Sequence, residues 1–284
     1  MKFFFILFAG IFLIATSAAA ESPLELQILK EFFSLTGVEN QSTRLTGGAL
    51  EYYSRRPMVG EYLPKNANTT FRLLTENDTT AIYEAVVSHD DVAEVPSAFF
   101  QRSLLGSKLA AIKSLHVPPY LRDVEYKNLL AEKGLTPAHS VRLRQLQRLF
   151  MSPDAFKEDF NKNLTIYETI AHMVETGKTE EAKTAAKEAA LLGVRLYGTT
   201  KSEGEMALLV NADSEKVEKK GSQLGSEIRI CGFLDNILGL LHLPTGVSPP
   251  EMSANDYIFI EALAENWYLF RNLAAEPLKE KSEK

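Results

Sequence analysis

Prolines stand in the first turn of several segments whose apolar residues recur every three to four positions. Ser22-Pro23, Thr136-Pro137 and Ser152-Pro153 each precede such a segment. A serine or threonine hydroxyl can accept hydrogen bonds from the free N–H groups of a first helical turn, where proline is also tolerated. This pattern predicts amphipathic helices. The segments that carry the pattern are 22–37, 38–56, 96–117, 120–133, 136–149, 152–177, 180–194, 214–243 and 253–275.

Strand-like alternation is rare, so we expect an all-α fold, a multi-helix bundle with a long glycine-spaced central helix over 214–243. Residues 55–70 are expected to form a loop, and Ala81 to Val87 are consistent with either a helix or a strand. The prediction is one helical domain over 21–275, with two subdomains divided near 57–95 as an alternative. The charged residues 276–284 are predicted to be a frayed tail.

The first twenty residues predict a signal peptide. Lys2 precedes thirteen apolar residues, Phe3 to Ala15, and the small run Ala18 to Ala20 resembles a cleavage site. Thirteen residues are fewer than the roughly 20 that span a bilayer. We therefore expect cleavage after Ala20, export to the periplasm or secretion, and no transmembrane segment in the mature chain.

Cys231 is the only cysteine, so the chain cannot form an internal disulfide. That composition favours a bacterial exported protein over a eukaryotic extracellular one, because small secreted eukaryotic domains often depend on disulfides. Four N-x-S/T sequons keep the eukaryotic route open as an alternative. They begin at Asn40, Asn68, Asn77 and Asn163.

The formal net charge of the 284-residue chain is −6. An acidic chain gains no net attraction to phosphate backbones, so we do not expect a nucleic acid partner. The histidines lack the spacing of a zinc site, and we predict no metal and no cofactor. They are His89, His116, His139, His172 and His242.

The most informative segment, Ser214 to Leu243, carries glycines at 221, 225, 232 and 239. On a single helix, glycines seven residues apart lie along one stripe. Each glycine inside a helix costs about 0.5 to 1 kcal/mol relative to alanine, so the stripe indicates a neighbour that approaches closely. We interpret the stripe as a packing seam within the chain. The alternatives are contact with another copy or another protein, or insertion of the helix into a membrane.

Asp235 and Asn236 lie inside the apolar part of the same segment. A buried carboxylate without a partner is costly, so we expect another helix to supply a hydrogen-bond partner. The candidate binding residues are therefore Gly225, Gly232, Gly239, Asp235 and Asn236. Cys231 is interpreted as a small buried apolar residue.

The sequence contains no G-x-S-x-G or S-x-x-K signature of a nucleophilic serine. Arg142, Arg144 and Arg148 form its one basic cluster, which we interpret as a surface stripe paired with acids. We therefore predict an exported, non-catalytic protein that binds a protein or a ligand in the bacterial cell envelope, with self-association also open.

Two alternatives remain. The first is an envelope hydrolase that uses Glu261 and Glu265, which would share a helix face beside Trp267. The second is a carrier of an apolar ligand, in a cavity lined by Phe99, Phe100, Phe156 and Phe160.

Overall fold

A computed structural model of the chain describes residues 23–34, 41–54, 56, 59–89, 92–115, 117–118, 120–202, 205–209, 223–233 and 236–273. The predicted signal peptide over 1–20, the predicted tail over 276–284 and Asp235 lie outside these residues. The helices are α1 (Leu24–Phe32), α2 (Gln41–Arg44), α3 (Gly47–Tyr53), α4 (Val59–Tyr62), η1 (Leu121–Tyr126), α5 (Lys127–Ala131), α6 (Pro137–Leu149), α7 (Pro153–Glu175) and α8 (Thr179–Glu188). The strands are β1 (Asn68–Glu76), β2 (Thr80–His89), β3 (Val92–Glu94), β4 (Ser97–Ser103), β5 (Gly106–Lys113), β6 (Gly193–Ser202), β7 (Glu205–Leu209), β8 (Gln223–Phe233), β9 (Asn236–His242), β10 (Tyr257–Ala264) and β11 (Trp267–Asn272).

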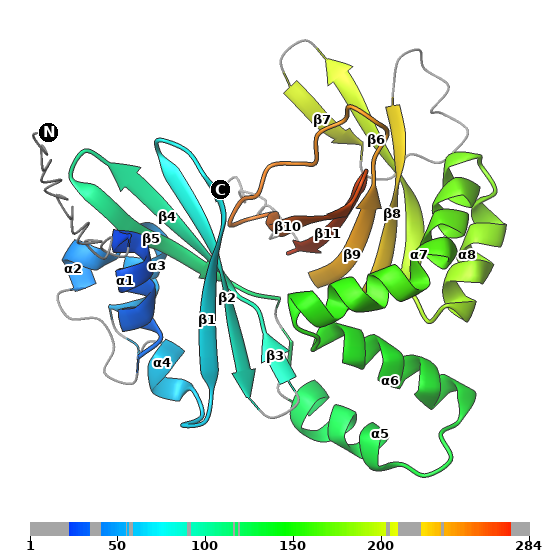
Figure 1. The fold of residues 1–284 in the computed structure, drawn as a ribbon, viewed down its shortest axis with the longest axis horizontal. Helices are drawn as coiled ribbons and strands as arrows, with labels where there is room; N and C mark the ends of the chain where they lie inside the picture. Colours follow the sequence, from blue (N-terminus) through cyan, green and yellow to red (C-terminus); the bar gives the residue numbers. More distant parts are fainter. Residues whose placement is uncertain are drawn as a thin grey trace, which may run out of the picture.

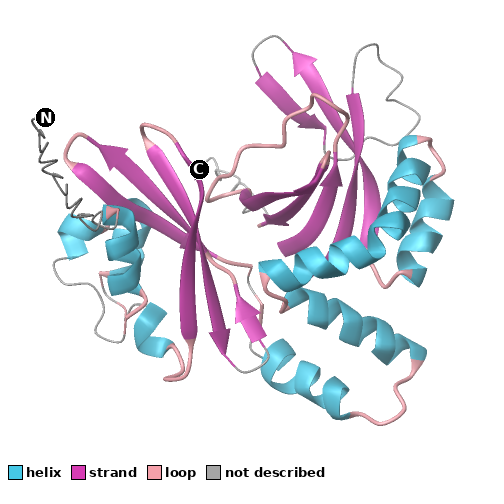
Figure 2. Cartoon of the chain, in the orientation of Figure 1, coloured by secondary structure: helices cyan, strands magenta, loops and turns pink. Residues whose placement is uncertain are grey.

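The predicted all-α bundle is wrong, because the chain forms two antiparallel sheets as well as helices (Figures 1 and 2). The first sheet has the order β1-β2-β4-β5, with β3 paired to β2. The second has the order β10-β11-β9-β8-β6-β7. The π-helix η1, α5 and α6 follow the first sheet in the chain and precede α7, α8 and the second sheet.

Helices α1 to α4 lie along one face of the first sheet (Figure 1). Ile28, Leu29 and Phe32 of α1 are fully buried and pack against the sheet in one apolar core. Successive strand residues point to opposite faces, so Ala81, Tyr83, Ala85 and Val87 of β2 meet the helices. Glu84 lies between Tyr83 and Ala85, so its side chain points to the opposite face, where the second sheet lies.

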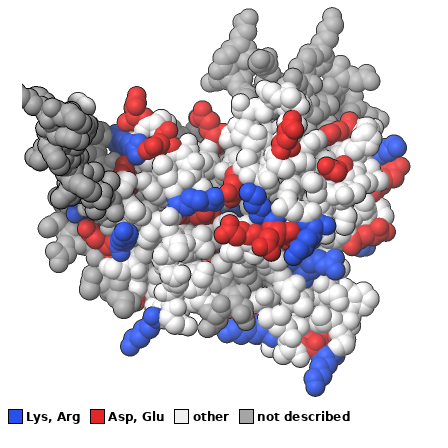
Figure 3. All heavy atoms as spheres, in the orientation of Figure 1, with Lys and Arg blue, Asp and Glu red and all other residues white. Residues whose placement is uncertain are grey.

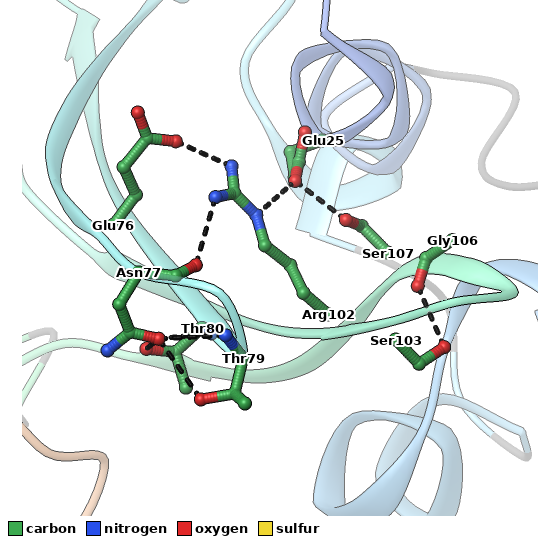
Figure 4. Close-up of polar contacts among 9 residues, drawn as sticks. All are labelled: Glu25, Glu76, Asn77, Thr79, Thr80, Arg102, Ser103, Gly106 and Ser107. Carbon is green, nitrogen blue, oxygen red and sulfur yellow. Dashed lines mark hydrogen bonds and ion pairs between the residues drawn. The ribbon is translucent and has the colours of Figure 1, made fainter.

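Arg102 of β4 connects α1 to the turn between β1 and β2 (Figure 4). Its Nε lies 2.8 Å from Glu25 Oε1, its Nη2 lies 2.7 Å from Glu76 Oε2, and its Nη1 lies 3.2 Å from the Asn77 carbonyl oxygen. The Ser107 hydroxyl also donates to Glu25 Oε1, at 2.6 Å. Burial raises the pKa of Glu25, but the Ser107 and Arg102 hydrogen bonds outweigh it, so the pKa lies below 4.5. The buried carboxylate of Glu25 is thereby held ionised.

Helices α6, α7 and α8 cover one face of the second sheet (Figure 2). Phe156, Phe160 and Tyr167 of α7 are buried against strand residues that include Ile228, Leu240 and Trp267. The opposite face holds a second cluster of Tyr197, Leu241, Leu243, Tyr257 and Phe270. Both faces of the central strands are therefore buried.

The helix predicted over 96–117 is instead the hairpin of β4 and β5. Leu104 and Leu105 completed the helical apolar pattern, yet both lie fully exposed in the turn. Gly106 has a φ of +114°, a conformation that favours glycine and fixes the end of the turn. The turn, rather than apolar periodicity, sets the structure of this segment.

The central helix predicted over 214–243 is wrong where the structure describes it, since β8 ends at Phe233 and β9 begins at Asn236. A short apolar run buried on both sides has no distinct period, so periodicity does not separate helix from strand. The final helix predicted over 253–275 is also wrong. It is the hairpin of β10 and β11, whose turn includes Asn266 at a φ of +63°.

Two predicted helix starts are confirmed. The Thr136 hydroxyl accepts a hydrogen bond from the His139 N–H at 3.2 Å, and the Ser152 hydroxyl accepts one from the Ala155 N–H at 3.3 Å. Pro137 and Pro153 occupy the first positions of α6 and α7. The undecided segment 81–87 is strand β2.

Candidate anion-binding pocket

Arg72 joins the two sheets. It lies directly opposite Glu84 in the β1–β2 pairing, and its Nη2 and Nε lie 2.7 and 3.0 Å from Glu84 Oε2. Its Nη2 also lies 3.0 Å from Glu261 Oε2 on β10, and its Nη1 donates to Glu261 Oε1. One guanidinium therefore binds a carboxylate from each sheet, a geometry that suits the planar fork of arginine.

Arg271 of β11 lies next to this group but is less well paired. Arg271 is 6% exposed, and its Nη1 has no hydrogen-bond partner among the described residues. The nearest carboxylate oxygen, Glu84 Oε1, is 3.9 Å away and is likewise unpaired. The Arg271 guanidinium stacks over the Phe259 ring at 4.5 Å. A donor atom of a buried cation is thus unpaired and covered by its neighbours.

Burial favours the neutral form of both the Arg271 and the Glu84 side chains. It lowers the pKa of Arg271 to about 10, and it raises the pKa of Glu84. Arg271 therefore remains cationic at neutral pH in a poorly solvated site. A buried charge of this kind is stabilised by an anion within hydrogen-bond reach.

Arg271 lines a pocket of about 270 Å³ at the junction of the two sheets. Its other charged lining residues are Arg122, at the start of η1, and Glu94 of β3. Most of the remaining wall is apolar, and comprises Ala93, Val95, Leu115, Val117, Leu149 and Phe150, with Ser114. The Ala93 N–H donates to the Phe150 carbonyl oxygen at 3.0 Å, which fixes β3 against the end of α6.

Arg122 is already occupied by carboxylates. Its Nε lies 2.9 Å from Asp123 Oδ1, and its Nη1 donates to Glu94 Oε1. The hydrogen bond to Asp123 and the nearby carboxylates raise the pKa of Arg122. Of the two arginines in the pocket, only Arg271 has a terminal nitrogen without a hydrogen-bond partner in the described structure.

The predicted glycine seam lies within the second sheet. A Cβ on Gly225 would meet the His242 carbonyl oxygen, and a Cβ on Gly232 would meet that of Asn236. A Cβ on Gly239 would lie 2.6 Å from the Phe270 ring. Each glycine therefore has a close neighbour on an adjacent strand of the same chain.

Neither these glycines nor Asn236 lines the pocket. Asn236 is the first residue of β9. Asp235 lies outside the described residues, so its hydrogen-bond partner stays a prediction. His242, the one histidine in the same segment, is paired through Nδ1 with Glu175 of α7 at 2.7 Å and lies beside Trp267.

The proposed carboxylate pair is not assembled. Glu261 is bound by Arg72, while Glu265 is exposed in the β10–β11 turn. The Glu261 carboxylate is held by the arginine and Glu265 lies beyond the end of β10, so the two do not form a pair that could act on one glycosidic bond. The expectation that they share a helix face is wrong.

The four phenylalanines predicted to line a ligand cavity are core residues. Phe100, Phe156 and Phe160 are at most 2% exposed, and Phe99 packs with Ile258 of β10. None of the four lines the cavities found among the described residues. Cys231 is also buried, and burial raises its pKa to about 12.

Two members of the basic cluster are paired with acids. Arg142 Nε lies 2.7 Å from Glu125, and Arg148 Nε lies 3.1 Å from Asp159. Arg148 is only 4% exposed, so the interpretation as a surface stripe is wrong for this residue. On the face drawn in Figure 3, basic and acidic side chains of the described residues lie beside one another and do not form a large patch of one sign.

Sequence reasoning missed Arg271. The available signal is its place in the run Trp267-Tyr268-Leu269-Phe270-Arg271. With a period of two, Trp267, Leu269 and Arg271 share one face, so a strand assignment would have marked the arginine as buried. A helical assignment keeps Trp267 and Arg271 on one face but moves Leu269 to another, so it does not mark the three as one buried row.

No protein-family model matches the sequence, and the searches of curated proteins and of solved structures found no match. Within the described part of the chain, no helix is long and apolar enough to cross a membrane, and no group of three or more His, Cys, Asp or Glu side chains is arranged to hold a metal ion.

Proposed function

We propose that the protein binds a small organic acid in the pocket at the junction of the two sheets, without transforming it. The observation that carries this proposal is Arg271 Nη1, a buried donor that lacks a hydrogen-bond partner and belongs to a residue lining the pocket. A ligand carboxylate that displaces the side chains covering this atom would accept a charge-assisted hydrogen bond there.

The apolar walls of the pocket support an organic ligand. Ligand sites are commonly apolar with a few polar groups that fix orientation. The apolar side chains between β3 and α6 offer such a wall to a short hydrocarbon body. Together with Arg271, they favour a monoanion with an apolar body over inorganic phosphate.

The predicted signal peptide at Met1 to Ala20 supports a setting outside the cytoplasm. In that setting, a binding protein of this kind would capture an organic acid in the cell envelope.

The test is calorimetric titration of the mature protein with hexanoate and with hexanol, which share a hydrocarbon body and differ in charge. We expect hexanoate to bind and hexanol to bind at least tenfold more weakly. Arg271→Met should weaken hexanoate binding by about 10- to 100-fold, because hydrogen bonds to charged groups contribute about 1.5 to 3 kcal/mol. Arg142→Met, which removes a partly buried arginine outside the pocket, is the matched control.

Equal binding of hexanoate and hexanol would contradict the proposal. So would undiminished hexanoate binding by a folded Arg271→Met protein. If wild-type protein binds no short carboxylate, Arg271 acts as the structural counter-ion of Glu84.

A further inference from the structure

A second cavity adjoins the pocket. It has a volume of about 570 Å³ and, like the first, is lined by Glu94 and Arg122. The ion pair between these two side chains is therefore a wall common to both cavities. The rest of the second cavity is largely apolar or aromatic, with Tyr52, Tyr53, Val59, Leu63, Pro64 and Val87 beside Arg56 and His89.

We propose that the ligand is a long-chain aliphatic carboxylate, with its head at Arg271 and its chain crossing the Glu94–Arg122 wall into the second cavity. This inference rests on the proposed function and adds the class of ligand. The smaller cavity supplies the buried cation, and the larger one supplies room and apolar walls for the chain.

The wall is built so that it can open. The Glu94 side chain is 51% exposed, so it can turn into water without leaving a buried charge. Arg122 would keep its two hydrogen bonds to Asp123, at 2.9 and 3.2 Å. Separation of the Glu94–Arg122 pair therefore leaves neither partner buried and unpaired.

The strand that carries Glu94 is also lightly held. Strand β3 has three residues and pairs only with β2 among the described strands. Short elements with few partners open at low free-energy cost. Ala93 stays anchored to Phe150, and the Pro96 carbonyl oxygen accepts a hydrogen bond from the Ala85 N–H at 2.9 Å, so the movement is confined to the Glu94 side chain.

Aromatic residues define the region of the second cavity formed by α3. Tyr52 and Tyr53 contact edge to face, with ring centroids 4.8 Å apart, and the Arg56 guanidinium lies 4.3 Å from the centroid of the Tyr52 ring. An aliphatic chain can pack against such ring faces without hydrogen bonds. A short acid would not reach them.

The experiment compares butanoate, hexanoate, decanoate and hexadecanoate by calorimetric titration. Each methylene that leaves water should raise affinity by about fourfold. In wild-type protein, the increase should continue from hexanoate to decanoate and hexadecanoate, once the effect of micelles is excluded. Leu63→Trp, which fills only the second cavity, should reduce decanoate affinity at least tenfold and leave butanoate affinity unchanged.

Glu94→Ala provides a second variant that does not depend on filling a cavity. Because Glu94 also lines the first pocket, its removal acts on both ligands, and decanoate affinity should rise at least threefold more than butanoate affinity. Glu76→Ala, which removes a half-exposed carboxylate from another arginine pair, is the control and should alter neither.

The outcomes separate the two proposals. In one outcome, butanoate binding depends on Arg271, affinity stops rising at hexanoate, and neither Leu63→Trp nor Glu94→Ala changes decanoate affinity. That outcome would overturn the long-chain ligand and keep the proposed function. Butanoate binding that does not depend on Arg271 would overturn the proposed function itself.

Discussion

Arg271 Nη1 and Glu84 Oε1 lie 3.9 Å apart, and both are buried atoms without a hydrogen bond in the described structure. The separation is short enough for strong attraction and too long for a hydrogen bond. Glu84 is held in place by two hydrogen bonds from Arg72. Its charge therefore offsets that of Arg271 without satisfying the Nη1 donor.

Glu84→Gln tests this relationship. The amide keeps the shape of the side chain but removes a negative charge beside Arg271, so hexanoate affinity should rise at least fivefold. Calorimetry at constant ionic strength measures the change. If Arg271 serves Glu84 alone, the variant will lose stability and show no gain in affinity.

A pH series provides an independent check. Because burial raises the pKa of Glu84, its carboxylate becomes neutral at a higher pH than an exposed glutamate. Affinity for hexanesulfonate, which stays ionised, should rise as pH falls through that raised pKa. In Glu84→Gln, this rise should be absent.

Stability at acidic pH should depend on Glu25. Its pKa is lowered in the folded protein, so its contribution is present above pH 4.5 and is lost as pH falls through the lowered value. Urea unfolding of Glu25→Gln should therefore show a flatter decline over the acid range than wild type. Glu51→Gln, at an exposed position, is the control. Parallel curves for wild type and Glu25→Gln would contradict the prediction.

Gly239→Ala should lower the free energy of unfolding by about 2 kcal/mol, because overpacking a filled site forces its neighbours to move. The new Cβ would lie 2.6 Å from the Phe270 ring and 2.7 Å from the Ile228 carbonyl oxygen. Gly193→Ala adds a methyl group where no atom of the described residues lies within 4 Å, and should change stability little. Size-exclusion chromatography should show the same assembly for both variants. A change of assembly in Gly239→Ala would indicate that another copy contacts this position.

Tyr167→Phe should stabilise the protein by about 1 kcal/mol, because the Tyr167 hydroxyl is buried without a partner among the described residues. Its ring stacks on Phe160 at 5.7 Å, a contact that phenylalanine keeps. Fluorescence of Trp267, the single tryptophan, reports unfolding of this core. Tyr52→Phe, at an exposed ring, is the control. Loss of stability in Tyr167→Phe would show that the hydroxyl has a hydrogen-bond partner.

Local chemistry made parts of the fold predictable. The hydroxyls of Thr136 and Ser152 accept hydrogen bonds from residues three positions later, and such signals need no knowledge of the rest of the chain. The apolar runs of β8 and β9 were not predictable in the same way. Their helix or strand character is set by burial on both faces, which is a tertiary property.

The candidate site was missed for a related reason. Arg271 is identified by a missing hydrogen bond and by an apolar wall from β3, the 114–117 connection and α6, all far away in the sequence. Nothing local to Arg271 specifies these neighbours. The glycines of β8 and β9 did signal close approach, but the sequence did not say whether a helix or a strand would be the neighbour.

The ion pair between Arg72 and Glu261 joins residues 189 positions apart, and Arg271 follows ten residues after Glu261. A ribosome therefore completes β1 to β5, and all of the α-helical layer, well before it adds the arginine. Until β11 is in place, the nascent chain lacks Arg271, the pocket arginine with an unpaired terminal nitrogen among the described residues. Recognition of an organic acid would then be acquired in one of the final steps of synthesis. The ligand would therefore not assist the folding of the segments made earlier.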